Sequence, residues 1–309
     1  MAINSDEILR DVLLATIKEQ RAKRRWGIFF KLITFLILIF IIISIFSKNE
    51  NLLKTDKNFT AMVDVNSIIG PDKQASADNI VSGIDEAFKA SGTKGIILRI
   101  DSPGGTPVQA SEVYNEIMRQ RALHPNIKIY AVCTDICASA AYYMASATDA
   151  IYANPSSLVG SIGVLMNGFG FTDTLQKLGI QRRLLTSGDH KGFLDPFSPM
   201  KPGDQQIAQT MLDSVHKQFI MDVVRGRGSR LKINQDTFSG LAWTGQQALS
   251  QGLIDGFGSP SQVARDVIKA DRIVDFTVKP NPFDLFADHI GASFANHIGA
   301  MIGFHGINE

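Results

Sequence analysis

The stretch KGIILRIDSPGGTP (residues 94–107) joins an apolar strand, a tight turn and the start of a helix. Its first part, 94–100, is short, apolar and rich in β-branched residues, which is typical of a buried strand. Two adjacent glycines then allow a sharp turn, and Pro107 suits a first helical turn. N–H groups at a helix start lack intrahelical acceptors, so this junction is a predicted site for stabilising a developing negative charge.

Strand-like and helix-like segments alternate on both sides of this stretch. The other predicted strands are residues 59–65, 127–133, 149–154, 161–166 and 182–186. The predicted helices are residues 76–90, 107–123, 138–146 and 203–225. Short strands connected by helical crossovers indicate an α/β domain. We interpret the basic cluster at 225–232 as the solvated last turn of the last helix.

Composition narrows the possible functions. The 309 residues are 45% hydrophobic, enough for a sizeable core, and the net charge of +1 gives no overall attraction to nucleic acid. Cys133 and Cys137, spaced C-x-x-x-C, fit neither a zinc knuckle nor a redox C-x-x-C motif. We expect two small buried thiols, with an oxidised pair as the alternative. No ligand cluster calls for a metal, and no cofactor is expected.

An apolar segment near the N-terminus has the length of a membrane span. Residues 27–46 are apolar apart from Lys31, and about 20 helical residues cross a hydrocarbon core of roughly 30 Å. Polar residues rather than a small-residue cleavage site follow, which predicts an uncleaved anchor. Cations crowd the preceding flank, namely Lys18, Arg21, Lys23, Arg24 and Arg25. The positive-inside rule then places the N-terminus in the cytoplasm and the body outside.

Ser139 is the candidate nucleophile. It follows the predicted strand 127–133 among small residues at a helix start, where its hydroxyl can stand clear and the N–H of Ala140 can face the substrate. For an isolated serine, a plain helix cap is the competing interpretation.

A serine nucleophile needs a base. None of the six histidines carries a usual triad signature around it. Lys191 follows a predicted strand and the flexible Gly188, and a lysine desolvated beside a serine can lose its proton near neutral pH. A solvated loop lysine is the competing interpretation for Lys191 alone.

Four motifs together carry a family resemblance. They are DSPGGT (101–106), ASAAYY (138–143), VGSIGV (159–164) and S-G-x-x-K (187–191). In this order and rough spacing they make residues 58–269 resemble the signal peptide peptidase A (SppA) family, in its small single-unit form. The resemblance implies an α/β, ClpP/crotonase-like domain of repeated ββα units, preceded by one N-terminal transmembrane helix. Family members usually carry Gly-Gly after the nucleophile, whereas Ala140 and Ala141 stand here.

The resemblance also implies the roles of individual residues. Ser139 attacks the peptide carbonyl and Lys191 abstracts its proton, forming a Ser–Lys dyad. Gly105 and Ala140 supply oxyanion N–H groups. Ser161 hydrogen-bonds the lysine amine and orients it.

The implied protein is a membrane-anchored serine endopeptidase that degrades hydrophobic peptides such as cleaved signal peptides. It would contact lipid through its anchor, with the catalytic domain on the outer (periplasmic) side of the bacterial cytoplasmic membrane. Family members form dome-shaped rings, and small forms take serine and lysine from adjacent subunits, so a homo-oligomer is expected. Two alternatives stay open. One is an NfeD-like membrane Ser–Lys endopeptidase with a specific membrane-protein substrate. The other is a catalytically silent scaffold, which the replacement of the usual Gly-Gly by Ala140 and Ala141 suggests. An acyl-CoA enzyme of the crotonase type suits an anchored outer domain poorly.

The expected domain organisation follows from these segments. It comprises a cytoplasmic segment (1–26), the transmembrane anchor (27–46), a linker (47–57), the peptidase domain (58–272) and a C-terminal tail (273–309) suited to oligomer contacts.

Overall fold

The computed structural model describes residues 5–50 and 58–279. The chain divides into two compact units, residues 1–56 and 57–309, and each is described by itself. Most of the predicted linker, and the predicted tail beyond residue 279, lie outside the described residues.

The first unit is built on one helix, α1 (Ser5–Glu50), which runs through the predicted cytoplasmic segment and anchor and into the predicted linker. Within the described residues, no helix combines the length and the apolar content needed to cross a membrane. The side chains of residues 41–46, which end the predicted span, lie outside the described part.

The second unit contains an eight-stranded sheet in its described part. Its strands are β1 (Phe59–Asn66), β2 (Thr93–Ser102), β3 (Lys128–Ala138), β4 (Ala150–Ala153), β5 (Leu158–Gly160), β6 (Ala242–Thr244), β7 (Gly256–Phe257) and β8 (Ile273–Asp275). The main order is β6-β5-β3-β2-β1-β8, and β4 pairs with β3 and β7. All pairs are parallel except β5 with β6. The predicted α/β class, with a mainly parallel sheet, is confirmed.

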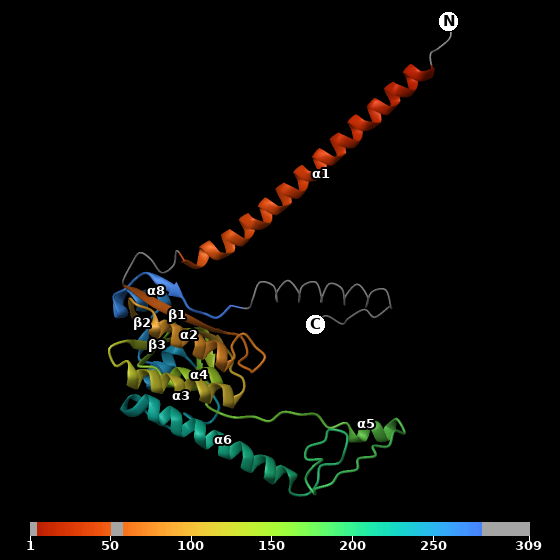
Figure 1. Ribbon diagram of the computed structural model, residues 1–309. Helices are drawn as coiled ribbons and strands as arrows, with labels where there is room; N and C mark the ends of the chain where they lie inside the picture. The colour runs from red at the N-terminus through yellow and green to blue at the C-terminus, as the bar shows by residue number, and fades with distance from the viewer. Residues whose placement is uncertain (1–4, 51–57, 280–309) are drawn as a thin grey trace. The chain divides into compact units, whose positions relative to one another are not determined.

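Helices connect these strands. They are α2 (Ala77–Lys89), α3 (Pro107–Leu123), α4 (Ala140–Ser146), α5 (Thr172–Lys177), α6 (Asp204–Arg227), η1 (Gly228–Arg230), α7 (Gly245–Ser250), α8 (Pro260–Gln262) and the π-helical turn η2 (Val263–Ile268). Figure 1 shows α2, α3 and α4 beside β1–β3, and α5 near the N-terminal end of α6. Pro107 opens α3, as the sequence predicts.

Side chains alternate between two cores along the central strand β2. Ile96, Leu98 and Ile100 face the larger core, whereas Ile97 packs on the opposite face with a small cluster that includes Val263 of η2. A strand buried on both faces is typical of parallel sheets with covered faces.

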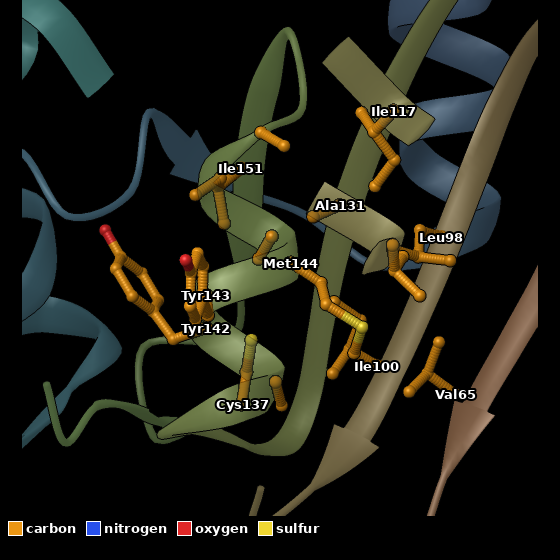
Figure 2. Packing of buried hydrophobic residues seen from close by; sticks show 14 of the residues in the cluster. Val65, Leu98, Ile100, Ile117, Ala131, Cys137, Tyr142, Tyr143, Met144 and Ile151 are labelled. Carbon is orange, nitrogen blue, oxygen red and sulfur yellow. The ribbon is translucent and has the colours of Figure 1, made fainter. Parts of the chain in front are cut away.

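Helix α4 is buried along its whole length. Figure 2 shows Met144 of α4 reaching toward Ile100 of β2. Burial of one such side chain stabilises the fold by about 1.5–3 kcal/mol. The helix that begins directly after Ser139 is therefore fixed in the core.

Two predicted strands, 161–166 and 182–186, are wrong. Both are irregular, and the short strand β5 lies just before the first of them. Their β-branched and apolar residues favour extended structure, but a strand also requires a neighbouring strand. Neither segment pairs with a strand in the described part of this chain.

Two further differences concern long-range contacts. The prediction of a solvated turn at 225–232 is wrong for Arg227, which is 1% exposed and bound to Asp255. This partner lies in a distant loop that helical periodicity does not reveal. Strand β8 pairs with β1, so the sheet continues beyond residue 272, where the predicted domain ends.

Candidate active site

Ser139 lies at a strained turn between β3 and α4. Its φ of 54° and ψ of −124° place a non-glycine residue in a region of the backbone map that L-residues rarely adopt. Such strain persists where the surroundings fix it, and it clusters at functional sites. Ala138 and Ala140 on either side are buried, whereas Ser139 is half-buried. The turn therefore presents the Ser139 side chain at the surface of a rigid core.

The Gly-Gly turn after β2 lies against Ser139. Gly104 has a φ of +111°, which glycine adopts readily. Backbone bonds of Ile69 fix the turn: its N–H donates to the Gly104 carbonyl (2.9 Å), and its carbonyl accepts from the N–H of Thr106 (3.1 Å). A Cβ on Gly105 would lie 1.9 Å from the Ile69 carbonyl oxygen, so only glycine fits there.

Ser161 lies next to Ser139 across the sheet. In the parallel register of β3 and β5, Ala138 pairs with Gly160. The N–H of Ser139 donates to the Gly160 carbonyl (2.8 Å), and the N–H of Ser161 donates to the Leu241 carbonyl (2.8 Å). Ser161 also has a positive φ, of 52°. The strand ends thus bring together two serines that are 22 positions apart in the chain.

An open cavity of about 460 Å³ is lined by four of the five predicted site residues, namely Gly105, Ser139, Ala140 and Ser161. Ala140 is the first residue of α4, and the first N–H groups of a helix have no intrahelical acceptor. Such N–H groups can stabilise an oxyanion if they point at the reacting carbonyl.

Lys191, the fifth predicted residue, does not line this cavity. It is exposed, and its N–H donates to the Gly188 carbonyl (3.1 Å) in a turn. The turn belongs to a segment that we call the arm, residues 163–203, which leaves the sheet after Ile162 and returns at the start of α6. One copy of the chain therefore does not bring Lys191 to Ser139.

The arm carries large exposed apolar side chains. Leu185 is 96% exposed, Leu165 81% and Phe169 76%. The arm folds on itself, since the N–H of Phe171 donates to the Pro196 carbonyl (2.7 Å). Exposed apolar surface of this kind marks interaction sites.

The sequence did not identify the apolar wall of the cavity. Val164 and Leu165 of the arm, and Val215 and Phe219 of α6, line it with the predicted residues. Val215 and Phe219 are four positions apart, so helical spacing could have placed them on one face. This face of α6 packs against α4, because the ring of Phe219 stacks on that of Tyr143 with centroids 4.6 Å apart.

The two cysteines are buried beneath the nucleophile turn and form no disulfide. Ile100 and Ser102 of β2 pair with Cys133 and Cys137 of β3, so the extra residues of β3 bulge out between the cysteines. Burial raises the pKa of the Cys137 thiol well above its usual value, and the neighbouring Cys133 adds to this effect. The buried thiol is thus kept protonated, which makes it a poor nucleophile.

Comparison with known proteins agrees with this geometry. The model of Peptidase family S49 matches residues 121–273, which include Ser139, Ser161 and Lys191. A Brucella abortus protein named Na(+)/H(+) antiporter NhaA is 42% identical over 175 residues, which cover 57% of this chain and 24% of that protein.

Two other relatives are named as peptidases. An Enterococcus faecium protein, whose name provisionally assigns it to signal peptide peptidase SppA, is 26% identical over 67% of this chain and 59% of its own length. The chloroplastic serine protease SPPA of Arabidopsis thaliana is 28% identical over 62% of this chain and 28% of its own length. This chain thus spans less than two thirds of the length of each of these three relatives. Residues 121–273 thus match the model of Peptidase family S49, and the chain is similar to relatives named as a signal peptide peptidase and a serine protease.

Proposed function

We propose that this chain is a serine endopeptidase in which Ser139 attacks the substrate carbonyl and Lys191 of a neighbouring copy acts as the base. The observation that carries the proposal is the strained Ser139 turn facing a cavity with Gly105, Ala140 and Ser161. The mainly parallel sheet and its crossover helices support a ClpP/crotonase-like fold.

The position of Lys191 supports a dyad formed across two copies. A base must come within about 2.6–3.2 Å of the hydroxyl that it deprotonates. Lys191 instead lies on the exposed arm, among apolar side chains suited to a contact between copies. Docking of an arm on the next copy, repeated around a ring, would complete every site and bury those side chains.

The chemical steps follow from these roles. Lys191 Nζ, in its neutral form, takes the proton of Ser139 Oγ as this oxygen bonds to the peptide carbonyl carbon. The N–H groups of Gly105 and Ala140 donate to the resulting oxyanion. Lys191 then gives its proton to the departing amine, and water hydrolyses the acyl-enzyme by the same route. Ser161 Oγ hydrogen-bonds the amine of Lys191 and keeps it directed at Ser139.

Apolar peptides, such as cleaved signal peptides, are the proposed substrates. The cavity wall of Val164, Leu165, Val215 and Phe219 supports this class, because apolar side chains gain most where water is displaced from apolar surface. Ala140 and Ala141 replace the family's usual glycines and add two buried methyl groups beside the nucleophile.

A membrane location also belongs to the proposal. Residues 27–46 form the proposed single-pass anchor, and the five cations before it favour a cytoplasmic N-terminus. The catalytic unit then works at the outer face of the bacterial cytoplasmic membrane, where apolar peptides released from the bilayer accumulate.

A fluorophosphonate probe and a fluorogenic apolar peptide test the activity. The parent protein should react with the probe and cleave the peptide, and Ser139→Ala should abolish both. Ser261→Ala, at an exposed serine of α8, is the matched control and should behave as the parent. A parent protein inert to both reagents would favour the silent scaffold, and activity confined to one membrane protein would favour the NfeD-like alternative.

A further inference from the structure

A histidine from α6 bonds to the backbone beside Ser161. His216 Nε2 lies 3.1 Å from the carbonyl oxygen of Ile162. Because a carbonyl oxygen only accepts, Nε2 must carry the proton of this bond. His216 is half-buried, whereas its neighbour Lys217 is exposed.

Ile162 lies between the site residue Ser161 and the start of the arm. It is fully buried and lies between Ser161 and the cavity-lining residues Gly163 and Val164. Beyond it the arm begins, and Leu165 is already 81% exposed. Ile162 is therefore the last firmly packed residue before the chain leaves the sheet.

Two backbone bonds hold the segment on its other sides. Gly160 accepts from the N–H of Ser139, and Ser161 donates to the carbonyl of Leu241, both at 2.8 Å. A Cβ on Gly163 would lie 2.9 Å from Cα of Gly240, so the two backbones cross closely there. Neither bond reaches the carbonyl of Ile162.

The conformation of Ser161 requires such support. A non-glycine residue at a φ of 52° is uncommon, and it persists when the surrounding structure over-determines it. The bond from His216 fixes the peptide that follows Ile162, one residue beyond Ser161. Loss of this bond would let the backbone of residues 161–163 relax toward ordinary angles and would shift the Ser161 side chain from its place in the cavity wall.

The same bond connects the residue before the arm to the helix that follows the arm. Ile162 precedes the outgoing end of the arm, while α6, which carries His216, begins at Asp204 where the arm returns. Val215 and Phe219 on this helix form part of the cavity wall.

We propose that His216 is a positioning residue that holds Ser161 in its strained conformation through the carbonyl of Ile162. The inference deepens the proposed function and rests on it, because Ser161 matters to the chemistry only if it orients Lys191. His216 itself touches neither the substrate nor the nucleophile.

Two classes of variant test the inference. His216→Gln keeps an N–H donor at about the position of Nε2. His216→Leu removes the donor and keeps much of the volume, and His216→Asn places its amide nitrogen near Nδ1, too short to reach Ile162. Lys217→Ala is the control on the same helix.

The first measurement is kcat and KM on the fluorogenic peptide, with active sites counted by the fluorophosphonate. We expect His216→Leu and His216→Asn to lower kcat by at least about tenfold with KM changed less than about twofold. His216→Gln should restore kcat to within about threefold of the parent. If both classes lower thermal stability alike while kcat per titrated site stays at the parent value, or if KM changes instead of kcat, the role is structural and the inference is wrong.

Hydrogen–deuterium exchange of the amides in residues 159–163 provides a measurement that needs no activity. Exchange at Ser161 should become faster in the Leu and Asn variants and stay slow in the Gln and Lys217→Ala proteins. A parent without peptidase activity would refute the proposed function alone, and the exchange pattern would still support or overturn the positioning of Ser161 by His216.

Discussion

Gly104 packs so closely on Ser139 that a Cβ built on Gly104 would lie 2.7 Å from the Cβ of Ser139. The same Cβ would lie 2.9 Å from the carbonyl oxygen of Ala138. The glycine turn and the nucleophile turn thus fit together without room for one added methyl group.

Gly104→Ala should therefore disable the site. The methyl group must displace the Ser139 turn, and the φ of +111° adds strain. We expect fluorophosphonate labelling of Ser139 to slow by at least about 100-fold, as in the loss of an aligned oxyanion site. Gly256→Ala, on β7, is the control, because its Cβ would meet only the Tyr152 ring, at 3.3 Å. Labelling of Gly104→Ala at the parent rate would contradict this close fit.

A dyad shared between copies predicts complementation. Ser139→Ala and Lys191→Ala should each be inactive alone, and the double variant should be no worse. When the two single variants are co-expressed, random ring assembly pairs an intact serine with an intact lysine at about a quarter of the sites. Peptidase activity of the mixed assembly is the measurement. A mixture as inactive as either variant would show that each copy completes its own dyad.

The ion pair of Arg227 and Asp255 should contribute strongly to stability. The Arg227 side chain is fully buried; it donates to Asp255 at 2.7 and 3.0 Å and to the Gly252 carbonyl at 3.0 and 2.8 Å. Arg227→Ala removes the buried guanidinium and leaves the half-buried carboxylate of Asp255 with the longer 3.4 Å contact to Arg230; breaking a buried pair typically costs about 3–5 kcal/mol. Urea unfolding followed by circular dichroism measures the loss. Arg265→Ala, which breaks an exposed pair with Asp266, should change stability by less than about 0.5 kcal/mol.

The same pair predicts a loss of stability in acid. Burial opposes ionisation of Asp255, but the hydrogen bond and charge of Arg227 outweigh it and hold the pKa of Asp255 below its usual value. This stabilisation is fully present above the unfolded-state pKa of about 3.9 and is lost as the pH falls through the lower folded-state pKa. The stability difference between the parent and Asp255→Asn should therefore shrink below about pH 4. A difference that is constant from pH 7 to pH 3 would contradict this account.

The proposed topology predicts which end of the chain is accessible from outside. Protease added to intact spheroplasts should remove an epitope placed after Glu309 and spare one placed before Met1, because five cations precede residues 27–46. Immunoblots before and after membrane rupture provide the control. The opposite protection pattern would overturn the orientation and the role at the outer membrane face that depends on it.

Local sequence chemistry predicted much of the fold. The apolar run 94–100 became the core of β2, and α3 begins at Pro107 and ends at Leu123, as expected. The predictions for 161–166 and 182–186 failed because extended propensity does not form a strand without a partner. In the described chain these residues belong to, or lead into, an arm that leaves the sheet.

The residues of the candidate site likewise fall into those that local sequence predicted and those that long-range contacts brought together. Local sequence features placed Gly105, and Ser139 with Ala140, at two strand-to-helix junctions, because glycine conformation, small residues and helix starts are local properties. The adjacency of Ser161 and Ser139 depends on the parallel register of β3 and β5, which brings separate strand ends to one edge. Three relationships arise only when the chain folds: Gly104 excludes a side chain beside Ser139, His216 bonds to the carbonyl of Ile162, and Lys191 lies on an exposed arm and does not line the cavity. These relationships join residues from different elements, and such contacts are fixed by packing and strand pairing rather than by the local preferences of either segment.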